Sequence, residues 1–221
     1  MSTIVQMFAF EDGHLAGGYS TQNFMETMNN IRLLMLCVEI CLRNIACMSV
    51  FYNTVTRACR LHSNVFYNSD FFVSETGWHY YRAVGDPKCD VYNGFVHQRD
   101  AGLCYRAESD LLTKTLSDSA CSARNSTLAI LNSEKKQNVV VGTLSLMSRE
   151  SFVGFYIGAT LNTGNSQWYW RDATLLVYNA FDAADDKLVS ETCVLMVADV
   201  SYKWYSEACT YTAGYVCEVD L

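Results

Sequence analysis

Proline and charged residues are scarce in this 221-residue sequence, which contains one proline, Pro87, and 18% charged residues. A low charge combined with 50% hydrophobic residues excludes an intrinsically disordered chain. Acidic residues outnumber basic ones by 23 to 16, so the net charge is −7. Such a chain lacks the positive surface that nucleic-acid binding requires. No apolar run reaches about 18 residues, so we expect no membrane-spanning helix.

Sequence motifs of catalysis and of metal binding are missing as well. The chain has no Gly-x-Ser-x-Gly motif, no phosphate-binding loop, no dinucleotide fingerprint and no EF-hand pattern. No spacing of cysteine and histidine matches a zinc site, and the histidines are scattered over the chain at His14, His62, His79 and His97. We therefore predict a protein that is not an enzyme and that needs no cofactor or metal.

Cysteine, by contrast, is abundant, with ten residues. An even number this high, without a zinc or iron–sulfur pattern, is typical of an oxidised, extracellular protein with five disulfides. One glycosylation sequon, Asn125-Ser126-Thr127, fits secretion. The first ten residues contain no basic segment, so we predict a strand at the start of a mature or trimmed chain rather than a signal peptide.

The cysteines also divide the chain. The first cluster comprises Cys37, Cys41, Cys47 and Cys59, and the second comprises Cys89, Cys104, Cys121, Cys193, Cys209 and Cys217. Both counts are even, so each half can pair its own thiols. The segment 83–88 between them contains the only proline and is typical of a turn-rich joint. We predict one domain over residues 1–87 and a second over residues 88–221.

The first half alternates strand and helix signals. Residues 3–10 predict a strand, and Asn30 is expected to cap a helix whose apolar positions recur between residues 31 and 45. Cys37 and Cys41, four residues apart, then lie on the same face of that helix. Two strands, 47–52 and 58–62, are expected to form a hairpin after it.

The spacing of these four cysteines, C-x3-C-x5-C-x11-C, and the closing segment Gly77-Trp78-His79-Tyr80-Tyr81 resemble the PAN/apple domain. The resemblance implies the pairs Cys37–Cys59 and Cys41–Cys47, and binding of proteins or glycans. The family's third disulfide, which joins the two ends of the domain, has no cysteines here. The strand ends near Phe8 and Tyr80 are therefore expected to be held by hydrogen bonds and packing.

The second half predicts helices from about residue 109 to Cys121 and from residue 133. Strands are expected over 153–159, 168–170, 192–196, 203–205 and 215–218. The order of its motifs resembles the long form of the C-type lectin-like domain. The motifs are Leu128-Ala129 before Asn132-Ser133-Glu134, then Tyr156-Ile157-Gly158, Trp168-x-Trp170, Trp204 and Tyr215-Val216-Cys217-Glu218. The resemblance implies the disulfides Cys89–Cys104, Cys121–Cys217 and Cys193–Cys209.

Sugar-binding members of that family hold a calcium ion with carboxylates and amides, and the sequence departs from this ligand set. Glu191 keeps the family's position two residues before a cysteine, and Asp185 lies near the position of the loop carboxylate. No proline follows Asp185, however, and Lys187 replaces an amide or acid. Tyr205 and Ser206 replace the amide and the carboxylate of the next strand. Because an ammonium group repels Ca²⁺ and cannot ligate it, we predict that the usual calcium site is absent.

The sequence leaves one alternative open at this site, namely a rebuilt calcium site that uses four acids. The candidate ligand-binding residues are Asp182, Asp185, Asp186, Glu191, Tyr205 and Ser206.

Together these features predict an α+β protein with two disulfide-rich domains. The first has a helix on an antiparallel sheet, and the second has two helices, antiparallel sheets and a long loop region. The expected function is secreted, calcium-independent recognition of a glycan or an extracellular protein. The alternative is a structural or assembly subunit of a homo- or hetero-oligomer, because the low charge and many aromatic residues leave surface for stable contacts.

Overall fold

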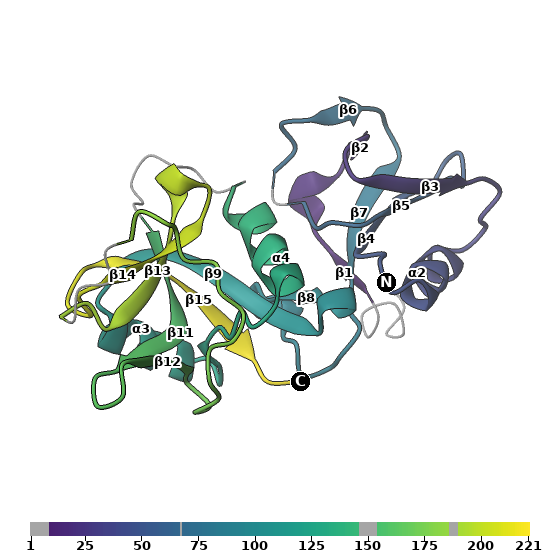
Figure 1. Ribbon diagram of the computed structural model, residues 1–221. Coiled ribbons are helices and arrows are strands. Elements are labelled where there is room, and N and C mark those ends of the chain that lie inside the picture. The colour runs from purple at the N-terminus through teal and green to yellow at the C-terminus, as the bar shows by residue number, and fades with distance from the viewer. Residues whose placement is uncertain (1–8, 67, 146–153, 186–189) are drawn as a thin grey trace. The chain divides into compact units, whose positions relative to one another are not determined.

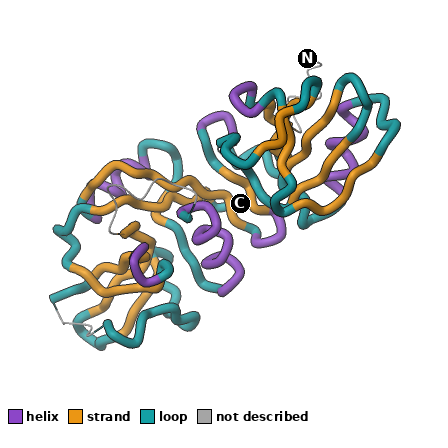
Figure 2. The backbone as a smooth tube through the Cα atoms, turned by 90° about the horizontal axis from the view of Figure 1, so that it is seen from above, coloured by secondary structure: helices purple, strands orange, loops and turns teal. Residues whose placement is uncertain are grey.

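A computed structural model describes residues 9–66, 68–145, 154–185 and 190–221. The chain folds as two compact units, which run from Met1 to Cys104, together with Leu221, and from Tyr105 to Asp220. No helix of the described residues is long and apolar enough to cross a membrane. The architecture is α+β, with short helices on mainly antiparallel sheets (Figures 1 and 2).

The first unit is built on a five-stranded antiparallel sheet with the order β1-β7-β4-β5-β3. Its strands are β1 (Ala9–Glu11), β3 (Phe24–Met28), β4 (Ser49–Asn53), β5 (Cys59–His62) and β7 (Trp78–Ala83). A separate two-stranded sheet pairs β2 (Gly18–Ser20) with β6 (Phe72–Ser74). Helix α2 (Leu34–Arg43) packs on β4, β5 and β7.

Both faces of the five-stranded sheet are buried, and each has its own core. Alternate residues of β4 supply them, because successive side chains of a strand point to opposite faces. Val50 and Tyr52 face α2, together with Tyr81 of β7. Phe51 faces a cluster of aromatic rings that includes Phe66 and Tyr80.

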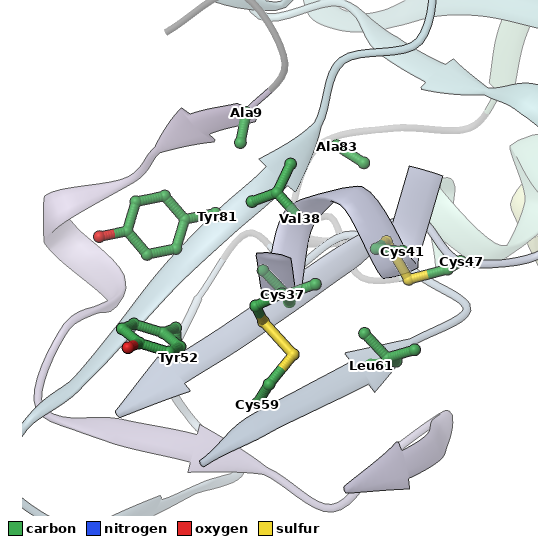
Figure 3. Close-up of a cluster of buried hydrophobic side chains, with 11 residues drawn as sticks. Ala9, Cys37, Val38, Cys41, Cys47, Tyr52, Cys59, Leu61, Tyr81 and Ala83 are labelled. Carbon is green, nitrogen blue, oxygen red and sulfur yellow. A yellow bond between two sulfur atoms is a disulfide. The ribbon is translucent and has the colours of Figure 1, made fainter. Parts of the chain in front are cut away.

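The disulfides of the first unit join α2 to its sheet, as Figure 3 shows. Cys37 pairs with Cys59 of β5, and Cys41 pairs with Cys47 just before β4. Both pairs were expected. The predicted start of the helix, in contrast, is wrong. Asn30 adopts a left-handed conformation with φ of 61°, which an N-cap residue does not have, and the helix begins only at Leu34.

The two ends of the first unit lie side by side, as expected for a domain without a terminal disulfide. β1 pairs with β7, placing Glu11 opposite Tyr81. A carboxylate oxygen of Glu11 lies 2.9 Å from Nδ1 of His79, and Asp12 forms an ion pair of 3.0 Å with Arg82. The described part of the predicted first strand is β1, since residues 1–8 lie outside the described chain.

The segment after Pro87 packs on the first unit, so the division by contacts falls later than residue 87. Arg99 donates to the carbonyl oxygens of Leu42 (2.7 Å), Cys41 (2.9 Å) and Asn44 (2.9 Å), and also to that of Cys47. Its guanidinium thereby caps the C-terminal end of α2. The assignment of residues 88–221 to one domain stays a prediction.

The second unit centres on a sheet with the order β14-β13-β11-β15-β9-β8, in which β11 and β15 are parallel and the edge strand β8 comes from residues before Tyr105. β10 pairs with β15, and β12 pairs with β11. The strands are β8 (Val96–Gln98), β9 (Leu103–Leu112), β10 (Thr127–Leu128), β11 (Gly154–Asn162), β12 (Gln167–Trp170), β13 (Cys193–Val197), β14 (Lys203–Glu207) and β15 (Ala213–Val219).

Two helices complete the second unit, α3 (Lys114–Ser122) and α4 (Glu134–Leu144). The predicted start of the first of them near residue 109 is wrong, because β9 continues to Leu112 and Thr113 then precedes the helix. α4 begins where it was expected, and the Ser133 side chain accepts a hydrogen bond from the Lys136 amide.

Two disulfides close the second unit, Cys121–Cys217 and Cys193–Cys209, and a third, Cys89–Cys104, lies in the segment just before it; all three pairs were expected. Next to Cys217, the buried carboxylate of Glu218 accepts hydrogen bonds from the Ile130 amide (2.7 Å) and from the Lys136 ammonium (2.9 Å). The last strand is thus tied to both helices.

His62 gives the first unit a predicted pH dependence. Its ring is fully buried, and Nδ1 lies 2.9 Å from the carbonyl oxygen of Gln22, which can only accept. The neutral ring therefore carries its proton on Nδ1, while Nε2 is buried with no partner among the described residues. Burial, with a smaller contribution from Arg60, lowers the pKa of His62 to about 4.

Because the unfolded state takes up a proton near pH 6.5 and the folded state only near pH 4, stability is lost as the pH falls through this window. We expect a loss of about 2 kcal/mol between pH 7 and pH 5. Urea unfolding at the two pH values, followed through NMR signals of β4, measures it. The variant His62→Phe keeps a ring among Phe51 and Phe66 and should lose this dependence; an unchanged dependence would contradict the assignment.

Candidate functional site

The predicted ligand-binding residues lie on β14 and on the loop that leads from β12 to β13. β13 pairs with β14 along its whole length, so the positions of Trp204, Tyr205 and Ser206 are fixed by the register. Trp204 and Ser206 are buried, and Tyr205 between them is partly exposed.

Trp204 is the residue that holds the loop against the strand. Its ring lies edge-on to Trp170, Tyr178 and Phe181, with centroids 5.6–5.7 Å apart. Its indole N–H donates to Oε1 of Gln137 on α4 at 2.9 Å. Its backbone accepts from the Asp182 amide (3.0 Å) and donates to Ala180 (2.9 Å). Residues 180–182 therefore run beside β14, and an isolated parallel β-bridge joins Phe181 to Trp204.

This arrangement brings Asp185, Glu191 and Ser206 together. The Ser206 hydroxyl oxygen lies 2.9 Å from Oδ1 of Asp185 and 3.1 Å from Oε2 of Glu191. The Ser206 amide donates to Oδ2 of Asp185 at 3.3 Å. A hydroxyl has one proton to donate, so the two carboxylates share a single donor. Ser206 thus occupies the space between the two acids.

Asp182 and Tyr205 form the neighbouring part of the cluster. Oδ1 of Asp182 accepts a hydrogen bond from the Ala184 amide at 2.8 Å. Burial raises the pKa of Tyr205, and the carboxylate of Asp182, which accepts a hydrogen bond from the phenol, raises it further. The phenol therefore stays protonated and remains a hydrogen-bond donor at neutral pH.

Five of the six candidate residues lie together in these hydrogen-bonded groups: Asp182, Asp185, Glu191, Tyr205 and Ser206. The sixth, Asp186, lies outside the described residues, as does Lys187. Within the described parts of the chain, no three histidine, cysteine, aspartate or glutamate side chains are grouped so that they could hold a metal ion. The rebuilt calcium site with Asp186 stays an untested alternative.

Asn125, the possible glycosylation site, lies on the turn between α3 and β10. It is exposed and has a left-handed backbone with φ of 51°. The hydroxyl of Ser126 bonds to the Cys121 carbonyl, and that of Thr127 lies 3.5 Å from the Glu218 carbonyl. The side chain of Asn125 is therefore available for modification while its neighbours belong to the fold.

Two features of the second unit were not found from the sequence. The first is the hydrogen bond that the Trp204 indole donates to Gln137, for which the sequence gives no signal. The second is an open hollow of about 610 Å³ beside the β11–β12 hairpin, lined by Thr160, Leu161, Asn162, Tyr169, Trp170, Arg171 and Ala173. No sequence pattern marks this hollow.

Comparisons with known proteins support the assignment of the second unit. Residues 111–219 match the family model described as "Lectin C-type domain". No curated protein matches the sequence.

Several solved structures share the fold. SPL-1 in complex with GlcNAc is 21% identical, with a TM-score of 0.54, over 61% of this chain and 98% of that one. Human lithostathine is 21% identical, with a TM-score of 0.52, over 57% and 96%. The Ca²⁺-independent C-type lectin SPL-2 from Saxidomus purpuratus is 19% identical, with a TM-score of 0.51, over 57% and 91%.

The shared donor predicts a measurable role for Ser206. In Ser206→Ala the carboxylates of Asp185 and Glu191 lose the hydroxyl, and we expect a destabilisation of about 1–2 kcal/mol in urea unfolding. Glu191→Gln keeps an acceptor for the hydroxyl and should change stability by less than about 1 kcal/mol. Ser190→Ala, an exposed serine of the same loop, is the matched control. Equal stability of Ser206→Ala and the parent protein would show that the hydroxyl is dispensable.

Proposed function

We propose that this chain, whose residues 111–219 form a C-type lectin domain, is a secreted recognition protein that binds glycans or proteins without a calcium ion. The observation that carries the proposal is the position of Ser206 between Asp185 and Glu191. Carboxylates that ligate Ca²⁺ must offer their oxygens to the ion, which needs six to eight of them. Here a protein hydroxyl and a backbone amide already form hydrogen bonds with this pair of carboxylates.

The neighbours in fold agree with this proposal. One of them was solved as a complex with GlcNAc, and another carries the description of a Ca²⁺-independent C-type lectin. The fold therefore accommodates recognition without the ion, and N-acetylglucosamine is a reasonable first probe for this chain.

For the first half, we propose a PAN/apple-like domain over residues 1–87, followed by a long-form lectin-like domain over residues 88–221. Support comes from the helix packed on an antiparallel sheet and from the nested disulfides Cys37–Cys59 and Cys41–Cys47. Both domain types serve recognition, which favours a binding protein over an enzyme.

Assembly into a homo- or hetero-oligomer is the second candidate function. Several large hydrophobic side chains of the first unit are exposed, among them Leu33 (67%), Val55 (75%) and Phe71 (61%). Exposed apolar surface of this kind suits a protein interface. Light scattering over a range of micromolar concentrations separates the two functions, because a strict monomer contradicts self-assembly.

Secretion predicts a glycan at Asn125. Glycosylation occurs on the growing chain in the secretory pathway, and Asn125 is exposed afterwards, so a glycan there does not interfere with folding. Expression through a eukaryotic secretory pathway should give an exported protein whose mass falls on treatment with a glycosidase. The variant Asn125→Gln should show no such fall. Export without any glycan would contradict the modification and leave secretion intact.

Calcium independence predicts an unchanged melting temperature when calcium replaces EDTA. An ion at a hundredfold excess over its Kd would stabilise the fold by about 2.7 kcal/mol and raise the temperature by several degrees. We expect no rise, and we expect binding on a glycan array in EDTA. A rise that Glu191→Gln abolishes would favour the rebuilt calcium site. Absence of both glycan binding and a captured protein partner would contradict the recognition function.

A further inference from the structure

We propose that the outer face of the β11–β12 hairpin binds a neutral pyranose ring directly. In this assignment Tyr169 is the stacking surface, and the amides of Asn162 and Gln167 are the hydrogen-bond donors. The proposal rests on the proposed function and gives it a site that is separate from the cluster around Ser206.

The strand register places these side chains on one face. Thr160 lies opposite Tyr169, and Asn162 lies opposite Gln167. Residues that face each other across an antiparallel pair point to the same side, and so do residues two apart on one strand. The four side chains therefore share a face, which is polar and largely exposed.

The other face of the hairpin is apolar and fixes it to the domain. Trp168 and Leu161 form the opposite pair, and Trp168 packs on Phe181 with ring centroids 5.1 Å apart. Trp170 is 2% exposed and packs edge-on against Trp204. The outer face is thus carried by a rigid support, which lowers the entropic cost of binding a ligand there.

Hydrogen bonds within the outer face orient its polar groups. The Tyr169 hydroxyl lies 3.1 Å from Oε1 of Gln167 and accepts from Nδ2 of Asn165 at 2.9 Å. Oδ1 of Asn162 accepts from the Gly164 amide at 2.9 Å. The oxygens of both amides are therefore engaged, whereas Nδ2 of Asn162 and Nε2 of Gln167 have no hydrogen-bond partner in the described part of the chain. Because both side chains are exposed, these two donors are accessible to an acceptor on a ligand.

The hollow beside this face fits the size and charge of a sugar. Its volume of about 610 Å³ lies within the range of small-ligand sites. Arg171 is the one charged residue among those that line it, and its guanidinium is neutralised by Asp220 at 2.6 Å while Nε donates to the Leu128 carbonyl at 2.7 Å. A neutral ligand suits such a site better than an anion does. A pyranose offers both a C–H face for the Tyr169 ring and hydroxyl oxygens for the amide donors.

Saturation-transfer NMR on the full chain in EDTA tests the assignment. The probes are N-acetyl-D-glucosamine, D-galactose, D-glucose and D-mannose, each titrated to obtain a Kd. We expect at least one to bind, and we expect Tyr169→Ala to weaken its binding about tenfold or more. Gln167→Ala should weaken it severalfold. Tyr169→Phe keeps the ring, so its affinity should fall between those of the parent protein and Tyr169→Ala.

Two control variants separate a local effect from a general one. Gln22→Ala removes an exposed glutamine of the first unit, and Ser190→Ala removes an exposed serine of the loop before β13; both should keep the affinity within about twofold. Circular dichroism and melting curves confirm that each variant is folded. Sugar binding that survives both Tyr169→Ala and Gln167→Ala would overturn the hairpin site and leave the proposed function standing. No binding of any probe or of any arrayed glycan would overturn the hairpin site together with glycan recognition.

Discussion

Closure of the second unit by Cys121–Cys217 is the constraint on which its loops depend. The disulfide spans 96 residues, and a cross-link of that length is expected to stabilise the fold by about 4–5 kcal/mol in the chain-entropy model. It joins the end of α3 to β15, and Glu218 extends the same junction to Lys136 on α4 and to Ile130 just after β10. With these elements fixed, the long segment between β12 and β13 need not form regular structure of its own, and its composition is free to vary.

Trp204 then determines where that irregular segment lies. It binds the loop backbone at residues 180–182, packs against three aromatic rings, and donates a hydrogen bond from its indole N–H to Gln137 on α4. The consequence is a cluster in which Asp185 and Glu191 face Ser206 rather than open solvent. A carboxylate whose oxygens already accept protein hydrogen bonds gains less from a cation, because binding the ion would break those bonds. Serine in place of an acid on β14 thus changes the chemistry of the site by one side chain.

Features that depend on residue spacing or on strong local signals could be predicted from the sequence. The disulfide pairs implied by the two resemblances agree with the structure, as does the start of α4 at the Ser133 cap. Prediction from the sequence failed where tertiary contacts outweigh local preference. Residues 109–112 continue β9, which lies between β15 and β8 in the sheet, although their own pattern suits a helix. The helix expected from Asn30 begins four residues later, and the docking of Arg99 on four carbonyl oxygens left no trace in the sequence.

At the candidate site, too, the sequence identified residues but not the contacts that the tertiary structure creates between them. The sequence named the acids and Ser206 because a family pattern marks those positions, yet it could not tell that a hydroxyl lies between two carboxylates. The hairpin face was missed because no pattern marks it: Asn162 and Gln167 are five residues apart in sequence and meet only through the register of β11 and β12. Without a cation, each sugar contact is limited to hydrogen bonds and stacking, so a single site of this kind binds weakly. If the first half also binds ligand, as proposed, a second recognition unit on the same chain would raise the effective concentration of the ligand, which would be a physical reason for joining the two units in one protein.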